Sequence, residues 1–430
     1  IPGTCYMTTQ DNLPQGYVEC AGFNRVKSDK IAYSKATRLQ MENQDHITGK
    51  TIVQKQTDTM YMVQNPPAKP LYRKELDKLF TLPFTRLPHP SYEKLGGVPS
   101  IREVEFSIIH NRGCFGGCNF CAITMHQGRF VTSRSHESVL AEAEKIAASP
   151  DFKGYIHDVG GPTADFRIPS CKKQVTEGLC PDRKCLAPTP CPHLQVDHSD
   201  YLELLRKIRA VKGVKRVFVR SGLRYDYIMH DKDDSFFKEL VQHHVSGQLK
   251  VAPEHCSAMV LEKMGKPYID TYVNFSKRYF ELSKSAGKEQ YLVPYLMSSH
   301  PGSTLDDAIE LAVFLKKHNI RPEQVQDFYP TPGTISTCMF YTELDPYTME
   351  KVYVAKNMHD KALQRALLQY YDSKNYKLCE EALRKAHRTD LIGSGKNCLI
   401  NGSQAKYNNK KQNGYNGYGK KSNKKFSKKR

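Results

Sequence analysis

Short apolar stretches alternate with amphipathic ones between about residue 100 and residue 335, and loops rich in Gly, Pro or His separate them. Short apolar runs are typical of buried strands, whereas apolar residues at helical spacing are typical of helices that cover a sheet. The strands that this pattern predicts are 104–110, 155–159, 216–220, 248–252, 291–297 and 324–329. Because strands and helices alternate, the predicted fold class is α/β, a partial or closed (βα)6 barrel of parallel strands.

The stretch after Gly302 illustrates one of the predicted helices. Asp306 and Asp307 place negative charge at its positive end, and Lys316 and Lys317 stand at its other end. Its apolar positions recur at helical spacing and are expected to be buried core: Leu305, Ala308, Ile309, Ala312 and Leu315.

The changes of pattern divide the chain into four parts. Residues 1–100 form a lead-in with helical stretches but no assignable fold, and we expect it to continue from a missing N-terminal region. Residues 101–335 form the predicted barrel, with a Cys-rich insertion at 162–198. Residues 336–395 are predicted to be a helical appendage, and residues 396–430 a disordered basic tail.

Composition and charge favour a protein of the cytoplasm. The chain has 430 residues, 39% of them hydrophobic, and lacks a run of about 18 apolar residues, so neither a membrane span nor a secretion signal is predicted. Much of the net charge of +19 lies at the end, where residues 401–430 contain Lys and Arg but no acid. Tyrosines interleaved with these lysines suit single-stranded RNA, although a solubilising tail explains the same composition.

Thirteen cysteines occur, and they are clustered. Three lie between Cys114 and Cys121, and four more lie between Cys171 and Cys191. In a cytosolic chain, clustered cysteines indicate metal sites before disulfides.

The first cluster has the spacing C-x3-C-x2-C: Cys114, Cys118 and Cys121. It directly follows the first predicted strand, and Gly116 and Gly117 let the loop wrap around a bulky cubane. Three thiolates leave one iron of a four-iron, four-sulfur cluster without a protein ligand. A zinc site with His126 as the fourth ligand fits the same spacing.

This segment, Arg-Gly-Cys-Phe-Gly-Gly-Cys-Asn-Phe-Cys-Ala-Ile-Thr, resembles the radical S-adenosylmethionine superfamily and, within it, the YgiQ family. The resemblance implies that the open iron binds S-adenosylmethionine, which is reductively cleaved to methionine and a 5′-deoxyadenosyl radical. That radical abstracts hydrogen from a substrate that the sequence does not identify. The resemblance also implies an electron donor of the flavodoxin or ferredoxin type.

The resemblance further implies which residues contact the cofactor. Phe120 is the aromatic expected before the last cysteine, and the remaining candidates follow later predicted strands: Gly160, Gly161, Ser221, Arg224 and Glu254. Other roles explain the same residues: the two glycines are typical of a tight turn, and the polar side chains are typical of hydrogen bonds that fix loops. No general acid or base is predicted.

The second cluster, Cys171, Cys180, Cys185 and Cys191, lies in the Pro-rich, Lys-rich insertion. A loop with so little apolar bulk usually needs a staple. The spacing C-x8-C-x4-C-x5-C leaves three interpretations open: a second iron-sulfur cluster, a zinc ion, or no metal. His193 and His198 are candidate substitutes for a thiol or candidate partners of the ligands.

The leading hypothesis is therefore a radical enzyme of unknown substrate. One alternative is a zinc-stabilised RNA-binding protein whose basic tail binds nucleic acid, and a radical enzyme that modifies RNA lies between the two. A further alternative is electron transfer without cleavage of the cofactor.

Overall fold

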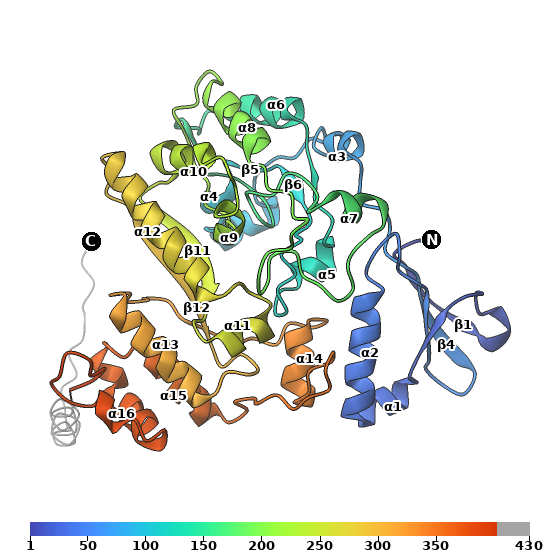
Figure 1. The fold of residues 1–430 in the computed structure, drawn as a ribbon. Coiled ribbons are helices and arrows are strands. Elements are labelled where there is room, and N and C mark those ends of the chain that lie inside the picture. The colour runs from blue at the N-terminus through green and yellow to red at the C-terminus, as the bar shows by residue number, and fades with distance from the viewer. Residues whose placement is uncertain (402–430) are drawn as a thin grey trace, which may run out of the picture. The chain divides into compact units, whose positions relative to one another are not determined.

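The computed structural model describes residues 1–401 (Figure 1). The chain forms two compact units. Unit 1 contains Ile1–Thr304 and Gln326–Ala355, whereas unit 2 contains Leu305–Val325 and the chain from Lys356 onward. Each unit is described by itself.

Unit 1 begins with a small four-stranded sheet, for which the sequence gives no assignment. Its strand order is β1 (Cys5–Thr9), β4 (Met60–Gln64), β3 (Ile52–Lys55) and β2 (Val18–Cys20). The pairs β1–β4 and β3–β4 are antiparallel, and β2–β3 is parallel. Helices α1 (Phe23–Ser28) and α2 (Lys30–Glu42) follow β2, and Ala36 of α2 packs with Cys20 and Ile52 of the sheet. The lead-in is thus a folded α/β element.

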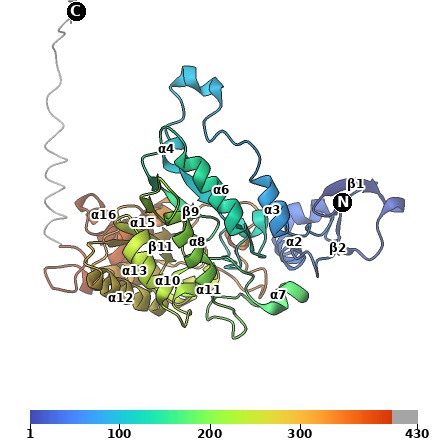
Figure 2. The same ribbon diagram turned by 90° about the horizontal axis from the view of Figure 1, so that it is seen from above.

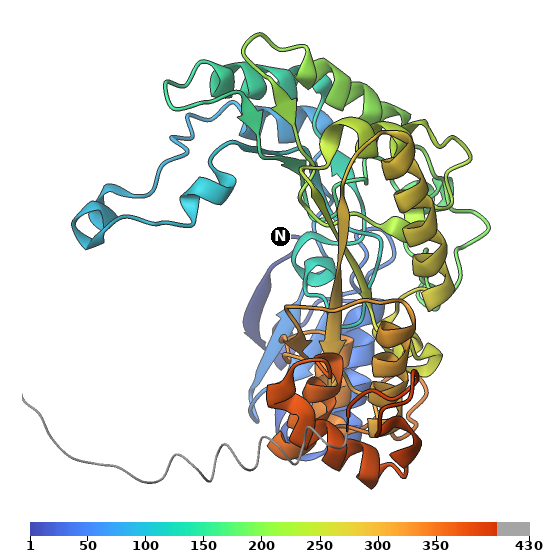
Figure 3. The ribbon, with the colours of Figure 1, turned by 90° about the vertical axis from the view of Figure 1, so that its left-hand side faces the viewer.

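A long connection, residues 80–105, joins this element to the parallel strands and projects from the rest of unit 1 (Figures 2 and 3). It follows α3 (Arg73–Leu79) and ends with α4 (Ile101–Val104). It contains no buried residue, and Phe84, Leu87 and Leu95 are exposed. The predicted strand 104–110 therefore begins too early. Val104 is the last residue of α4, and none of the side chains of α4 is buried.

The parallel strands form a partial βα barrel, as the pattern predicts. Strand β5 (Ser107–Ile109) pairs with β9 (Asp158–Gly160), and β8 (Tyr155–Ile156) pairs with β10 (Arg216–Val217). The amide of Val159 donates to the carbonyl of Phe218 at 3.0 Å, which joins these two pairs into one layer. Strands β11 (Gln248–Glu254), β12 (Tyr291–Ser298) and β13 (Gln326–Asp327) form a second parallel group.

Amphipathic helices cover these strands. In α8 (Ser199–Arg209), the buried face includes Leu202, Leu205 and Ile208, and the hydroxyl of Tyr201 donates to the carbonyl of Val159 at 2.5 Å. The other elements of this part of unit 1 are β6 (Asn111–Arg112), α5 (Ile123–Gln127), β7 (Thr132–Ser133), α6 (His136–Ala147), α7 (Lys172–Thr176), α9 (Tyr225–Ile228), α10 (Ser235–Glu239), α11 (Ala258–Met264), α12 (Ile269–Ser285) and α14 (Ile335–Thr342).

Unit 2 is helical and consists mainly of α13 (Leu305–Lys317), α15 (Met358–Leu368) and α16 (Tyr376–Lys385). The apolar stripe predicted for α13 is buried at Ala308, Ile309, Ala312 and Leu315. Leu399 and Ile400 are also buried, so packed chain extends to the end of the described residues. Residues 402–430, which contain almost all of the predicted basic tail, lie outside them.

Among residues 1–401, helices that combine the length and the apolarity needed to cross a bilayer are absent. The four-part domain division stays a prediction.

Candidate metal centre

The loop that carries the first three cysteines follows β6 and ends in α5. The amide of Cys114 donates to the carbonyl of Gly128 at 3.0 Å, and the amide of Asn119 donates to that of Met264 at 2.8 Å. These bonds hold the loop at its start and near its end. Cys114, Cys118 and Cys121 are all free thiols of intermediate exposure, so a ligand can reach them.

Two side chains from loops that follow parallel strands contact the thiols. The Sγ atom of Cys114 lies 3.1 Å from Oγ1 of Thr163, and Nη1 of Arg224 donates to Sγ of Cys118 at 3.3 Å. A Cβ atom on Gly116 would lie 2.6 Å from Nη1 of Arg224, so only glycine lets the loop approach this guanidinium. The structure thus brings the predicted Arg224 to the cysteine loop.

The three thiols lie close enough to one another for their charges to interact. Burial, together with the charges of Cys118 and Cys114, raises the pKa of the Cys121 thiol to about 11, although Lys266 acts to lower it. Burial also raises the pKa of Cys114. The hydrogen bond with Thr163 and the charge of Arg224 lower this pKa, and the charge of Cys118 raises it. Thiolates so close together repel one another unless a cation sits between them, and metal coordination supplies that cation.

The arrangement suits a cluster better than a single ion. Among residues 1–401, His, Cys, Asp and Glu side chains do not gather in threes closely enough to hold one metal ion. Zinc needs its ligands about 2.0 to 2.3 Å from one point, whereas a cubane spreads its thiolates over separate irons. His126, the alternative zinc ligand, is exposed on α5. The donor set therefore fits a four-iron, four-sulfur cluster.

Arg224 is held rigidly from behind. Its Nε and Nη2 atoms donate to the two carboxylate oxygens of Asp226 at 2.8 and 2.5 Å, and its amide donates to Asp165 at 2.9 Å. Burial would raise the pKa of the Asp226 carboxyl, but the charge and hydrogen bonds of Arg224 hold that pKa below its ordinary value. Asp226 is therefore a charged partner that aims Arg224 at Cys118.

Gly160 and Gly161 lie at the end of β9, where neighbouring side chains press on the backbone. A Cβ atom on Gly160 would lie 2.0 Å from Oγ of Ser221, and one on Gly161 would lie 1.7 Å from Oδ1 of Asn111. The hydroxyl of Ser221 bonds to the carboxylate of Asp158, which also accepts the Ser221 amide at 3.0 Å. Both glycines therefore have a packing reason to be glycine, and their contact with a cofactor stays a prediction, as does that of Ser221.

Gly161→Ala is expected to destabilise the apoprotein by about 1–3 kcal/mol, because the methyl group overpacks a closed contact. Asn111 can hardly move away, since its amide donates to the carbonyl of Thr163 at 2.8 Å and to that of Phe166 at 2.5 Å. Thermal unfolding checks this, with Gly222→Ala as the matched control because nothing lies within 4 Å of a Cβ there. Equal midpoints for the two variants would contradict the packing argument.

Glu254 ends β11 as a buried residue with a positive φ of 69°. Burial raises the pKa of its carboxyl, while Lys266 and Arg224 lower it. Lys266 is itself buried, and its charge acts on Cys121, Asp226 and Glu254. Lys266 thus lies close enough to Cys121 and to Glu254 to lower the pKa of both groups.

Three residues of the site were not predicted from the sequence: Lys266, Asp226 and Thr163. Thr163 follows Gly160 and Gly161 directly and could have been found from that position. Lys266 follows α11 and shares no motif with the cysteines, so only the tertiary structure reveals it.

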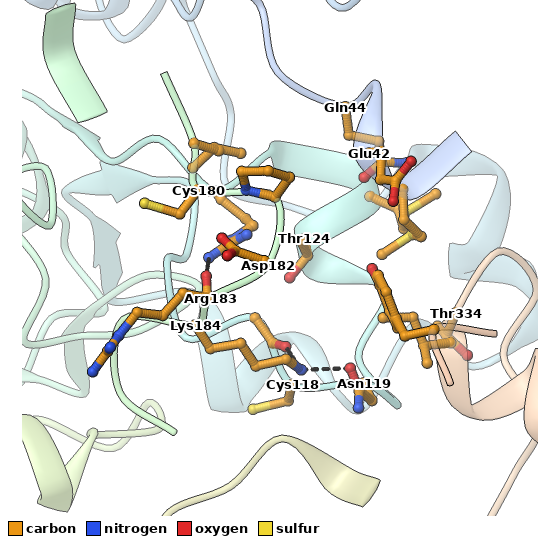
Figure 4. A pocket seen from close by; sticks show the side chains of 18 of the residues that line it. Glu42, Gln44, Cys118, Asn119, Thr124, Cys180, Asp182, Arg183, Lys184 and Thr334 are labelled. Carbon is orange, nitrogen blue, oxygen red and sulfur yellow. Dashed lines mark hydrogen bonds between the residues drawn. The ribbon is translucent and has the colours of Figure 1, made fainter. Parts of the chain in front are cut away.

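A cavity of about 390 Å³ opens beside the loop (Figure 4). Cys118, Cys121 and Thr124 line it, and α2 contributes Glu42. The ammonium of Lys184 reaches into it, donating to the Gly117 carbonyl at 2.6 Å and to the Asn119 side chain (Figure 4). Burial lowers the pKa of Lys184 to about 7. Of the predicted cofactor-binding residues, Gly160, Gly161, Ser221, Arg224 and Glu254 do not line this cavity. Arg224 contacts the cysteine loop at Cys118.

Phe120 packs inward rather than into the cavity. It lies against the apolar cluster of Val260, Leu261 and Met264, and its ring meets that of His300 edge-on at 6.1 Å. This contact fixes the loop between Cys118 and Cys121.

The second group of cysteines converges as well. Cys171, Cys180, Cys185 and Cys191 all line one small cavity of about 30 Å³, although they are spread along the insertion. Burial raises the pKa of Cys185, Arg129 lowers it, and the charges of Cys171 and Cys191 raise it. His193 is exposed, and His198 is buried between Asp165 and Asp231, so neither is placed as a ligand.

Three family models match successive parts of the chain. "Radical SAM N-terminal" matches residues 1–107, "Radical SAM superfamily" matches residues 108–315, and "Domain of unknown function (DUF3362)" matches residues 323–429. The middle match begins within β5 and includes every cysteine of both groups.

Curated relatives match over most of the chain. A UPF0313 protein of Clostridium perfringens strain SM101 is 56% identical over 401 residues, which are 93% of this chain and 60% of the relative. A UPF0313 protein of Clostridium botulinum strain ATCC 19397 is 54% identical over 400 residues, which are 93% of this chain and 62% of that relative. The chain therefore spans about 60% of the length of these relatives.

A solved structure is also similar. The radical S-adenosylmethionine methyltransferase TsrM from Kitasatospora setae, with cobalamin and a [4Fe-4S] cluster bound, has 14% sequence identity and a TM-score of 0.34. The match covers 66% of this chain and 61% of TsrM.

Proposed function

Because the chain belongs to the radical S-adenosylmethionine superfamily, we propose that it binds a four-iron, four-sulfur cluster through Cys114, Cys118 and Cys121 and cleaves S-adenosylmethionine reductively. The observation that carries this proposal is the gathering of three accessible thiols on one loop, next to the end of the first parallel strands. Active sites of βα folds form at this end of the sheet. The substrate is not identified.

When bound, the cluster and S-adenosylmethionine together supply a 5′-deoxyadenosyl radical that abstracts hydrogen from the substrate. The protein's own residues position these groups. Thr163 and Arg224 orient the thiols of Cys114 and Cys118, and Phe120 anchors the loop in the core.

The buried Glu254 and Lys266 suit the cofactor's amino and carboxylate groups, one charge for each. Gly160, Gly161 and Ser221 stand at the neighbouring strand ends, where they would contact the same molecule. These roles belong to the proposal and await substitution of each residue.

An anaerobic cleavage assay tests the proposal. Protein reconstituted with iron and sulfide is reduced in the presence of S-adenosylmethionine, and 5′-deoxyadenosine is measured by mass spectrometry. We expect product that depends on the reductant. Protein that carries the cubane and yet releases no 5′-deoxyadenosine over a range of reductants would sink the proposal.

The same proposal includes an electron donor of the flavodoxin or ferredoxin type and a cytoplasmic setting, in which the free thiols stay reduced. The version in which RNA is the substrate rests on residues 401–430, nearly all outside the described residues. A steep fall of RNA affinity with salt, lost when that segment is deleted, is its test. Zinc in place of iron after anaerobic purification would favour the RNA-binding alternative.

A further inference from the structure

The insertion that carries the second group of cysteines has almost no apolar core of its own. Between Cys171 and Asp197 the only helix is α7, and the buried apolar side chains are Leu186 and Ala187. A segment of this kind cannot offset the entropy of ordering by burial alone, and such segments are usually held by disulfides or metal. All four cysteines are free thiols, so disulfides do not hold it.

The fold nevertheless brings the four thiols together. They line one cavity of about 30 Å³, and the amide of Cys191 donates to the carbonyl of Cys185 at 2.9 Å, which closes the last loop of the group. Each of the four has intermediate exposure. Thiols spread over the length of the insertion thus converge on one small space, which is what a shared ligand requires.

Cations surround the same space. Arg129, Arg183 and Lys184 line the cavity together with the four thiols, and acidic residues are absent from its lining. The Nε atom of Arg129 is buried without a hydrogen-bond partner. A cubane with four thiolates carries a net negative charge, so this shell of cations suits it, and an unpaired guanidinium nitrogen is available to its sulfurs.

We propose that Cys171, Cys180, Cys185 and Cys191 hold a second iron-sulfur cluster, a four-iron, four-sulfur cubane with one thiolate on each iron. A zinc ion bound by the same four thiols is the competing occupant, and the metal content decides between the two. The cubane is larger and distributes its ligands over four irons.

A cubane with a thiolate on every iron has no open position, so it carries electrons and does not bind S-adenosylmethionine. Its position suits this role, because Cys180, Lys184 and Arg129 also line the larger cavity onto which Cys118 and Cys121 open. It takes one electron from a low-potential donor of the ferredoxin or flavodoxin class and passes it to the cluster on the Cys114 loop. This role, unlike the site itself, rests on the proposed function.

Iron and sulfide analysis of reconstituted full-length chain tests the site. Wild-type chain, and Cys5→Ser as the control at an exposed thiol, should hold about eight irons and eight sulfides. Chain in which Cys114, Cys118 and Cys121 are all changed to alanine should keep about four of each. Its reduced EPR signal should not change when S-adenosylmethionine is added, since the open iron is gone.

Changing the four cysteines of the insertion to serine should also leave about four irons, now with a signal that S-adenosylmethionine does perturb. The single change Cys180→Ser guards against misfolding of the fourfold variant and should lower the iron content in the same direction. The proposal is overturned if the Cys114, Cys118, Cys121 triple variant binds no iron, or if wild-type chain holds about one zinc there. Failure of 5′-deoxyadenosine formation alone would leave the iron count intact, so the two proposals fail separately.

Discussion

Cys118→Ala is expected to lower the formation of 5′-deoxyadenosine by more than about 100-fold. Changes to residues that only support a metal ligand cost about 10- to 100-fold in metal affinity or activity, so loss of a ligand should cost at least as much. The side chain of Cys118 lines the cavity and accepts a hydrogen bond from Arg224, so it connects the two. Product is measured by mass spectrometry after a single anaerobic incubation.

Two further variants make this result specific. Cys5→Ala removes an exposed thiol that is far from Cys118 in the sequence, and this variant should form as much product as the wild type. Cys118→Ser keeps a hydrogen-bond acceptor for Arg224 but replaces the thiolate, so a merely structural role would let it rescue activity. Product within about threefold of wild type in Cys118→Ala would show that the cysteine is no ligand.

The parallel strands and the cysteine loop were predictable because their signals are local. A strand such as β12 appears as a short apolar run, and the spacing of three cysteines within one loop stands in the sequence itself. Each predicted motif follows the end of a predicted strand, and the carboxyl ends of parallel strands lie at the same edge of a sheet. The order of motifs along the chain therefore also predicted that they share this edge.

The N-terminal sheet was not predictable in this way. Strand β1 is almost entirely exposed, so it carries no alternation of buried and exposed positions. Its place depends on pairing with β4, more than fifty residues later, which no local pattern reveals. The role of Lys266 was hidden for the same reason, because only the fold brings its charge close to Cys121. Asp226, by contrast, stands two residues after Arg224, and its pairing is local.

Asp226→Ala is expected to destabilise the apoprotein by about 3–5 kcal/mol. Its side chain is 1% exposed and that of Arg224 is 9% exposed, so removal of the carboxylate leaves a guanidinium buried without its partner. Arg224 could turn to Cys118 or Cys114, but burial keeps the pKa of Cys114 raised, and a protonated thiol supplies no counter-charge. The midpoint of thermal unfolding measures the loss.

The chain itself offers the matched control. Arg388 and Asp390 form the same two-bonded pair at the same spacing, with distances of 2.9 and 3.0 Å, but their side chains are 44% and 60% exposed. Water solvates either charge when the other is removed, so Asp390→Ala should leave the midpoint within experimental scatter. If both variants lose the same stability, burial is not the cause. If neither variant lowers the midpoint, Asp226 does not hold Arg224, and another contact must orient Arg224 toward the cysteine loop.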